Sequence, residues 1–353
     1  MWVAADDSKL QYSGRIGWKK NPDGNEAALF YYAASLVRVR FRGCSIKAVI
    51  QNKRVYWSNY LGVIIDGIQT KICLDKEENA EDYLLCDNLT DEEHELILFK
   101  RQDACHMFTL YGFELDGSSP ELLPVAKKPE RRIEVFGDSV SCGEVSEAVE
   151  YVGKKDPEHD GEFSNSWYSY AWMTARRLGA ELHDTSQGGI ALLDGTGWFA
   201  EPDYLGMESC YDKLAYNPQL GETSCWDFSR YTPQVVIVAI GQNDNHPDDY
   251  MADDYEGERA DNWRKHYKKF VMRLMEIYPL AHIILQTTLL QHDVGWDKSI
   301  EEVCRQIGSP RVHHFLYRRN GCATPGHLRI SEAEEMASEL GAYIESFGKE
   351  IWK

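Results

Sequence analysis

The sequence predicts two domains: an N-terminal all-β jelly roll or β-sandwich, and a C-terminal three-layer α/β domain with one parallel sheet between helices. Three observations lead to this prediction. The chain has 353 residues, more than a single small module needs. Apolar residues recur at every second position in the first third, whereas short apolar runs alternate with helical patterns in the rest. A stretch rich in proline and serine lies between them.

The first domain is predicted from strands with one buried face. Val37, Val39 and Phe41 alternate with three arginines, which is the period of a half-buried strand. The turn pair Asp66-Gly67 closes a hairpin. Short strands in close succession, with almost no helical period, favour a sandwich or jelly roll. The same period is found at residues 46–50, 60–65, 95–100 and 108–115.

The linker is expected between residues 117 and 132, where Pro120, Pro124 and Pro129 interrupt regular structure. We therefore predict a first domain at residues 1–125 and a second at 126–353. Five short strands are expected in the second domain. The third is nearly all apolar, as in a sheet covered on both faces. Their ranges are 133–136, 181–185, 234–240, 282–288 and 312–317.

Helices are predicted between these strands. Asn165 or Ser166 caps a helix that stops at Gly179. An apolar stripe from residue 263 to 277 marks a second helix, which ends before Pro279. Ser331 and Glu334 form a capping box ahead of the last helix.

Charge and composition exclude several classes of protein. Lys plus Arg is 38 and Asp plus Glu is 57, so the formal charge of −19 would repel nucleic acid or an acidic membrane. No apolar run of about 18 residues is present, so we expect a soluble protein. The N-terminus carries acids where a signal peptide would carry a basic patch. Nine cysteines without metal-type spacing are interpreted as reduced, mostly buried thiols of a cytoplasmic protein with no metal site.

Residues suited to chemistry follow the predicted strands. In an open parallel sheet, ligands bind just beyond the carboxyl ends of the strands. Ser139 follows the first strand, Gly188 and Gly189 the second, Asn243 the third, and His327 comes after the last. We therefore expect all of them at one rim of the sheet.

This set fits an acyl-transfer site. Ser139 is the candidate nucleophile, and His327 is the base that takes its proton and later returns it to the leaving group. The tetrahedral oxyanion needs hydrogen-bond donors. The candidates are the backbone N–H groups of Ser139 and Gly189 and the side-chain amide of Asn243.

These motifs resemble those of the SGNH (GDSL-type) hydrolases. Gly-Asp-Ser at 137–139 resembles the first block, Gly188-Gly189 the second, residues 241–244 the third, and His327 the last. The preceding β-rich region is similar to the jelly roll of carbohydrate esterase family 2. The resemblance implies an SGNH-hydrolase fold for the second domain. It also implies removal of acetyl groups from polysaccharides such as xylan and glucomannan, without a metal or other cofactor.

One position departs from the pattern. Most SGNH hydrolases place an aspartate three residues before the histidine, and Thr324 stands there. Family 2 esterases are similar in often using a Ser-His dyad. We therefore predict a dyad, with no Asp or Glu oxygen within hydrogen-bond reach of the His327 ring.

Other candidates lie near these blocks. Asp138 is expected to accept backbone N–H groups, with contact to substrate as its second role. Trp198 and Trp296 are the candidates for stacking on a sugar, although most tryptophans are expected in the core. His246 is a pocket candidate and backup base, and His159 is interpreted as part of a solvated loop.

The resulting prediction is a serine esterase that deacetylates xylo- or manno-oligosaccharides through an acetyl-enzyme on Ser139. Two alternatives stay open: an SGNH lipase or thioesterase for longer acyl chains, and a non-catalytic carbohydrate-binding protein. No nucleic-acid or membrane partner is expected, and a homo-oligomer is left open. The jelly roll is expected to support the hydrolase domain or to form a subunit interface, rather than to contact substrate.

Overall fold

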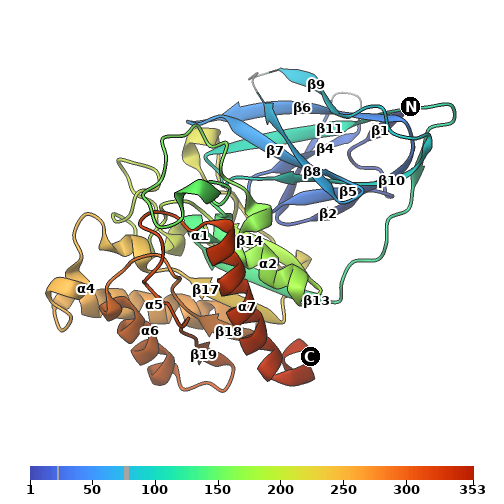
Figure 1. Ribbon diagram of the computed structural model, residues 1–353. Helices are drawn as coiled ribbons and strands as arrows, with labels where there is room; N and C mark the ends of the chain where they lie inside the picture. Colours follow the sequence, from blue (N-terminus) through green and yellow to red (C-terminus); the bar gives the residue numbers. More distant parts are fainter. Residues whose placement is uncertain (22–23, 75–78) are drawn as a thin grey trace.

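The computed structural model describes residues 1–21, 24–74 and 79–353. Figure 1 shows a β-sandwich above an α/β domain, with the N-terminus in the sandwich and the C-terminus in the α/β domain. The predicted fold class is confirmed for both parts.

The sandwich consists of two antiparallel sheets. One has the order β3-β4-β11-β6-β9, with β1 paired to β11. Its strands are β1 (Trp2–Ala4), β3 (Ile16–Lys20), β4 (Glu26–Phe30), β6 (Ser45–Arg54), β9 (Ala80–Cys86) and β11 (His106–Asp116). The other has the order β12-β5-β10-β7-β8, with β2 paired to β5. Its strands are β2 (Gln11–Ser13), β5 (Leu36–Gly43), β7 (Asn59–Ile65), β8 (Ile68–Leu74), β10 (Glu92–Lys100) and β12 (Glu121–Leu123).

The period of two predicted for the sandwich strands is confirmed in β5. Val37, Val39 and Phe41 are buried between the sheets, and Arg38 and Arg42 face solvent. Apolar side chains from both sheets fill the space between them, and form one continuous core.

The second domain is built on a parallel sheet of order β14-β13-β17-β18-β19. Its strands are β13 (Arg131–Gly137), β14 (Ala180–Ser186), β17 (Val235–Ala239), β18 (His282–Leu285) and β19 (Val312–His314). All five residues of β17 are buried, as expected for a strand covered on both faces.

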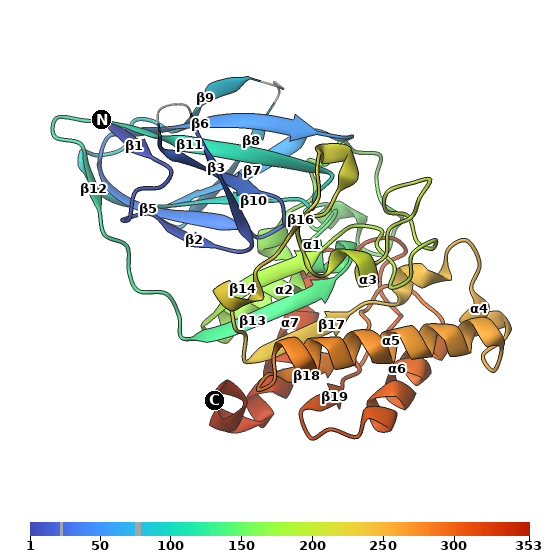
Figure 2. The same ribbon diagram turned by 180° about the vertical axis from the view of Figure 1, so that it is seen from behind.

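Helices cover both faces of this sheet. Helices α2 (Tyr170–Arg177) and α7 (Ile330–Ser346) pack on one face, which Figure 1 shows in front. Helices α5 (Glu258–Ile277) and α6 (Val294–Ile307) pack on the other, which Figure 2 shows. Short elements complete the domain: α1 (Ser139–Cys142), α3 (Met207–Cys210), α4 (Tyr250–Asp253), β15 (Lys213–Ala215) and β16 (Ser224–Cys225).

Several predicted helix boundaries are wrong. Asn165 caps only a 3₁₀ turn at Ser166–Tyr168, and Ser169 caps α2. Helix α7 begins at Ile330, one residue before the predicted cap, because the Glu332 carboxylate accepts the backbone N–H of Arg329. Helix α6 was not among the predicted helices. It begins where the Asp293 carboxylate accepts the N–H of Gly295 at 2.7 Å.

An extended segment links the two domains covalently, whereas residues outside this segment form the contacts between them. Figure 2 shows the chain leaving β12 and running along the outside of the molecule to β13. Away from this linker, Arg15 of the sandwich forms a buried ion pair with Glu134 of β13 at 2.9 Å. Thr185 and Tyr278 also donate to the Glu134 carboxylate. Because both charged groups are buried and hydrogen-bonded to several partners, this ion pair holds the two domains in one relative position.

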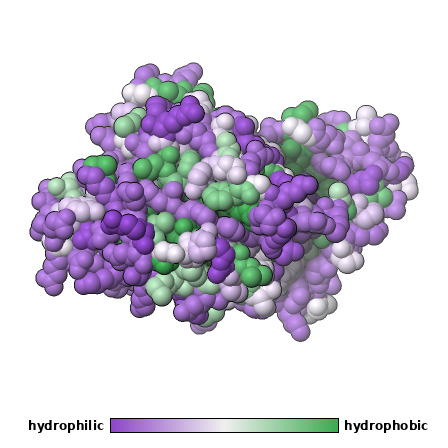
Figure 3. All heavy atoms as spheres, turned by 90° about the horizontal axis from the view of Figure 1, so that it is seen from below, coloured by the Kyte–Doolittle hydropathy of each residue, from purple (hydrophilic) through white to green (hydrophobic). Residues whose placement is uncertain are grey.

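Figure 3 shows one face that is mostly hydrophilic, with hydrophobic side chains in small groups. None of the described helices is long and apolar enough to span a membrane. All nine cysteines are free, but only Cys105, Cys142 and Cys210 are buried, so the expectation that most of them are buried is wrong. Cysteines in loops and on exposed faces of strands are not hidden by the apolar character of the thiol alone.

Candidate active site

A pocket of about 360 Å³ lies beyond the carboxyl ends of β13, β14 and β17. It brings together four predicted site residues, Ser139, Gly189, Asn243 and His327, and the stacking candidate Trp198. The rest of its lining comes from both domains: Gly188, Glu144, Leu290 and Gly326 of the α/β domain, and Tyr56 and Asp103 of the sandwich. The predicted convergence at one rim of the sheet is what the fold produces.

Ser139 is the first residue of the short helix α1, directly after β13. Asp138 caps this helix, and one of its carboxylate oxygens accepts the N–H of Val140 at 3.0 Å. The other oxygen accepts the Gln242 amide at 2.6 Å and faces the Asn243 amide at 3.5 Å. Burial raises the pKa of Asp138 to about 6, while these donors oppose the shift.

Asp138 is 1% exposed and its oxygens are occupied by protein donors. The prediction that it accepts backbone N–H groups is confirmed. Its second predicted role, contact with substrate, is wrong because no substrate group can reach it. Asp244 is used in a similar way, since it accepts the N–H groups of Leu192 and Leu193 at 2.7 and 3.2 Å.

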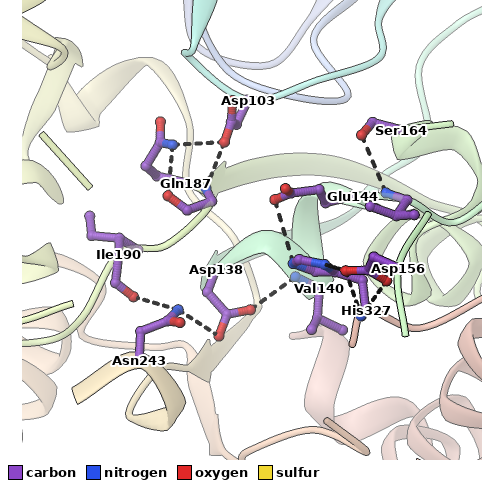
Figure 4. A network of polar contacts seen from close by, with 12 residues as sticks. Asp103, Asp138, Val140, Glu144, Asp156, Ser164, Gln187, Ile190, Asn243 and His327 are labelled. Atoms are coloured by element: carbon purple, nitrogen blue, oxygen red, sulfur yellow. Dashed lines mark hydrogen bonds and ion pairs between the residues drawn. The ribbon is translucent and has the colours of Figure 1, made fainter. Parts of the chain in front are cut away.

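The candidate oxyanion donors lie around Ser139. Within the described parts of the chain, the backbone N–H groups of Ser139 and Gly189 donate to no protein acceptor. Gly189 has φ +71°, and a Cβ there would lie 2.8 Å from Cβ of Trp198, so glycine suits this turn. The Asn243 amide donates to the carbonyl of Ile190 at 3.0 Å, which fixes its direction (Figure 4).

His327 is oriented by a carboxylate, contrary to the predicted dyad. Asp156 Oδ2 lies 2.7 Å from Nδ1 of the imidazole, and Oδ1 accepts the backbone N–H of His327 at 3.0 Å. Thr324 holds the position three residues earlier, and its hydroxyl donates to Glu332 instead. The dyad prediction fails because the loop that follows α1 supplies the acid, 171 residues before the histidine.

Asp156 is itself held in place. Arg329, which is fully buried, donates to Asp156 Oδ1 at 2.9 Å and to the carbonyl of His327 at 2.7 Å. A Cβ at Gly326 would lie 2.6 Å from Asp156 Oδ1, so the chain approaches closely only because this residue is glycine. Although burial raises the pKa of Asp156, hydrogen bonds from His327 and Arg329 bring it down to about 2.

A second acid faces the other nitrogen of the imidazole. Glu144 Oε2 lies 3.7 Å from Nε2 of His327 (Figure 4). Burial raises the pKa of Glu144, and the His327 charge opposes this. Burial lowers the pKa of His327, but the charges of Glu144 and Asp156 outweigh it and raise the pKa to about 9. A neutral imidazole, the form that acts as base, is therefore favoured as the pH rises towards 9.

Comparison with known proteins identifies the architecture. A family model, Carbohydrate esterase 2 N-terminal, matches residues 12–124. The structure of a family two carbohydrate esterase from Cellvibrio japonicus covers 100% of this chain and 98% of its own, with a TM-score of 0.81 and 26% identity. The chain therefore has the fold of the family two carbohydrate esterases, and its first domain matches their N-terminal domain. A second structure, of a family two carbohydrate esterase from Clostridium thermocellum in complex with cellohexaose, has a TM-score of 0.79 and 25% identity over 98% of this chain and 100% of its own.

Two curated relatives align with this chain. An acetylxylan esterase/glucomannan deacetylase from Cellvibrio japonicus is 28% identical over 96% of this chain and 88% of its own length. Cellulase/esterase CelE from Acetivibrio thermocellus is 27% identical over 97% of this chain. The chain spans only 40% of the length of CelE.

The two candidates for stacking on a sugar lie in different surroundings. Trp198 is 60% exposed beside the pocket, and its ring stacks on His246 with 3.5 Å between centroids. His246 thus supports Trp198 from behind. Trp296 is fully buried in α6 against Trp263 and Tyr250, so its prediction as a sugar contact is wrong. The error follows from the missed helix, since an indole at a helical core position is packed on all sides.

His159 is not part of a fully solvated loop, as the sequence suggested. Its half-buried ring packs against Trp57 of the sandwich at 4.8 Å between centroids, and its Nδ1 accepts the N–H of Gly161. The loop that contains both His159 and Asp156 is therefore anchored to the first domain.

Sequence reasoning missed three polar residues that line the pocket, Tyr56, Asp103 and Glu144, and it missed Asp156, which orients His327. Each lies in a loop, and two lie in the other domain. No spacing within the chain reveals such contacts. The one available signal was a polar run, residues 156–162, soon after the nucleophile and rich in acids.

Proposed function

We propose that this protein hydrolyses O-acetyl esters on xylo- or manno-oligosaccharides through an acetyl-enzyme on Ser139. The observation that carries the proposal is a single pocket lined by Ser139, His327 and the candidate oxyanion donors, with His327 oriented by Asp156. An aspartate on Nδ1 keeps that nitrogen protonated, and leaves Nε2 to act as the base.

The proposed reaction has two halves. Ser139 Oγ attacks the acetyl carbonyl carbon while Nε2 of His327 takes the hydroxyl proton. The tetrahedral intermediate collapses, the bond between the acetyl carbon and the sugar oxygen breaks, and His327 protonates that oxygen. Water, deprotonated by His327, then attacks the acetyl-enzyme, and acetate leaves as Ser139 regains its proton.

Charge stabilisation is assigned to the unused donors. The oxyanion would accept hydrogen bonds from the N–H groups of Ser139 and Gly189 and from the second N–H of the Asn243 amide. Each such donor is worth about 3 kcal/mol in comparable sites. Asp156 contributes by stabilising the imidazolium that forms in each half-reaction.

The carbohydrate substrate is supported by the surroundings of the pocket. The exposed indole of Trp198 at its edge offers a flat apolar face for a pyranose ring. Asp103 and Glu144 line the pocket and the whole chain carries −19, so neutral acetylated sugars are favoured over uronic acids. The same carboxylates are unfavourable neighbours for the apolar atoms of a long acyl chain. Among the relatives named above, one is an acetylxylan esterase/glucomannan deacetylase, and another was solved in complex with cellohexaose.

The principal test is acetate release by the wild type and by Ser139→Ala on acetylated xylan, acetylated glucomannan and p-nitrophenyl acetate. We expect turnover by the wild type and a loss of at least about 10³-fold in the variant. Ser346→Ala, an exposed serine on α7, is the matched control and should retain activity. A folded wild type without activity on any of these esters would refute the proposal.

The alternatives predict different results. A series of p-nitrophenyl esters should peak at acetate; a peak at eight carbons or more would favour a lipase. A carbohydrate-binding protein with an inactive site would bind oligosaccharides in both wild type and Ser139→Ala, without turnover in either.

The contribution of Trp198 is tested by Trp198→Ala. Loss of one aromatic stacking contact is worth about 0.5 to 1.5 kcal/mol, so KM for acetylated oligosaccharides should rise about 2- to 10-fold. The kinetic constants for p-nitrophenyl acetate, which has no sugar, should stay near those of the wild type. Equal effects on both substrates would instead show that Trp198 only shapes the Gly189 turn.

We also propose a cytoplasmic role on short imported oligosaccharides, for which the nine free thiols give support. Product analysis that found activity on insoluble acetylated polymer, and none on oligosaccharides, would contradict this.

A further inference from the structure

The segment Lys100 to Asp103 of the sandwich reaches into the hydrolase domain. It begins at the last residue of β10, and Asp103 at its end lies beside Gln187 (Figure 4) and accepts the N–H of Gly188. Asp103 is 6% exposed, and both its oxygens are used by protein donors. A carboxylate from the first domain is thus in direct contact with the candidate oxyanion turn of the second.

Asp103 contacts this turn at two points. Its Oδ2 accepts the backbone N–H of Gly188 at 2.8 Å and the side-chain amide of Gln187 at 2.7 Å. The fit depends on glycine, because a Cβ on residue 188 would lie 2.4 Å from the same oxygen. The other oxygen, Oδ1, accepts the N–H of Cys105 at 2.9 Å, which fixes the carboxylate within its own loop.

The Gln187 amide passes this restraint to the next peptide unit. Its Nε2 also donates to the carbonyl of Gly188 at 2.9 Å, and its Oε1 accepts the Tyr216 hydroxyl at 2.8 Å. The carbonyl of Gly188 and the N–H of Gly189 belong to one planar trans peptide, in which they point in opposite directions. Fixing the carbonyl towards Gln187 therefore directs the Gly189 N–H away from it.

The segment that presents Asp103 is held firmly. The ammonium group of Lys100 is buried and donates to the backbone carbonyls of Gln102 and Asp103. Arg101, also buried, donates to the Glu147 carboxylate at 2.6 Å and to the carbonyl of Ser164 at 3.1 Å. Because these bonds are charge-assisted, they restrict the position of Asp103 more strongly than an ordinary surface loop would.

We propose that Asp103 is a positioning residue through which the sandwich domain sets the direction of the Gly189 N–H in the oxyanion hole. The inference rests on the proposed function, since it assigns Gly189 as a donor to the oxyanion. It goes further by making the first domain part of the catalytic geometry. Asp103 acts through Gln187 and Gly188, and does not touch the reacting atoms.

The test compares Asp103→Ala and Asp103→Asn with Asp66→Asn. Asp66 is a sandwich carboxylate that binds His94 and the N–H of Glu95, so its variant controls for loss of charge in the same domain. With p-nitrophenyl acetate, kcat of Asp103→Ala should fall about 10- to 100-fold. This is less than the loss expected when an oxyanion donor is removed altogether, because the Gly189 N–H is misdirected rather than absent. KM should change less than about twofold. Asp103→Asn keeps one acceptor and should lose less.

Hydrogen exchange measured by mass spectrometry supplies a readout independent of activity. In Asp103→Ala, amides in peptides that span residues 186–190 should exchange at least about tenfold faster than in the wild type. Asp66→Asn should leave both the exchange and kcat unchanged.

A folded Asp103→Ala with wild-type kcat and wild-type exchange in this turn would overturn the proposal. If Asp103→Ala fails to fold, the isosteric Asp103→Asn decides, because it must then show intermediate kcat and faster exchange. If the wild type hydrolyses no ester, the proposed function fails, and unchanged exchange in the variants would reject the positioning role separately.

Discussion

The sandwich meets the α/β domain at two contacts that differ in what they restrain. At the first, Arg15 pairs with Glu134 in the middle of β13 and donates to the carbonyls of Tyr211 and Lys213. At the second, Lys100 to Asp103 binds two loops that line or support the pocket. Both contacts use buried charges with several partners. The first fixes the domains to each other, whereas the second also determines where pocket groups point.

Two contacts made of the same kinds of residue can therefore have different effects, one on stability and one on turnover. A buried ion pair within the sheet affects mainly the free energy of unfolding. A buried carboxylate that ends on a pocket turn affects mainly the geometry of the transition state. Variants at the two contacts should therefore separate stability from turnover.

The largest effect is expected in the loop that the Arg101 contact anchors. Asp156→Asn should lower kcat about 10²- to 10⁴-fold, because an amide can present an N–H to Nδ1 and stabilise the wrong imidazole tautomer. The measurement is kcat for p-nitrophenyl acetate, with circular dichroism to verify folding. Asp160→Asn, in the same loop but bonded to Ser58, is the control and should stay within about threefold of the wild type. Equal losses in both variants would mean that the loop matters only as a structure.

Asp156→Asn should also change how the free energy of unfolding depends on pH below about pH 4. The pKa of Asp156 is held at about 2, below that of an unfolded aspartate, so its contribution is present above about pH 4. That contribution is lost as the pH falls through about 2. Urea unfolding of the wild type should therefore weaken more between pH 4 and pH 2 than that of the variant.

The next largest effect is expected at the first contact. Arg15→Met leaves the Glu134 carboxylate buried without its cation, and should reduce the free energy of unfolding by about 3 to 5 kcal/mol. Below its melting temperature, the variant should keep the KM and pH profile of the wild type. Urea unfolding and steady-state kinetics give the two readouts. A variant with unchanged stability and reduced kcat would reverse the comparison.

An intermediate effect is expected for Arg101→Met. Loss of the bonds to Glu147 and Ser164 should cost about 1 to 3 kcal/mol of stability. Because these bonds hold the loop that carries Asp156, kcat should also fall severalfold. Urea unfolding and steady-state kinetics test this. A loss of stability with unchanged kcat would mean that Arg101, like Arg15, affects only stability.

The smallest effect is expected for Glu144→Gln. The Glu144 charge helps to raise the pKa of His327 to about 9, so a neutral amide should move the pH midpoint of kcat/KM downwards by about one unit or less. A pH profile from 5 to 10 measures the shift, with Glu150→Gln, an exposed glutamate outside the pocket lining, as control. A midpoint that does not move would show that Glu144 leaves the base unaffected.

The interaction of Glu144 with His327 can also be tested through the pH dependence of stability. Because the folded pKa of His327 lies above its unfolded value of about 6.5, its contribution is complete below that pH and disappears as the pH rises through about 9. Glu144→Gln should flatten this decline.

Sequence patterns predicted what depends on local regularity. The period of two in β5 and the apolar β17 follow from burial of one or both strand faces. The order of Ser139, Gly189, Asn243 and His327 could be read because the carboxyl ends of parallel strands share an edge. Helix α6 was missed because Asp293, Asp297 and Lys298 masked the apolar stripe around Trp296.

Contacts between distant loops could not be predicted. Asp156 reaches His327 across 171 residues, and Asp103 reaches Gly188 across 85. Their positions depend on how one loop packs on another domain, which leaves no periodic mark in the sequence. The departure at Thr324 indicated only that the usual acid was missing, not where its replacement would be found.

The course of the linker has a consequence for recombination. The chain between Leu123 and Arg131 looks like the natural place to divide the gene, since it has no helix or strand. The groups that complete the pocket, however, come from loops on both sides of that division. A chimera that joins this α/β domain to a foreign sandwich would keep Ser139 but lose the pocket residues that the sandwich supplies. The two halves should therefore be exchanged, evolved and expressed as one unit.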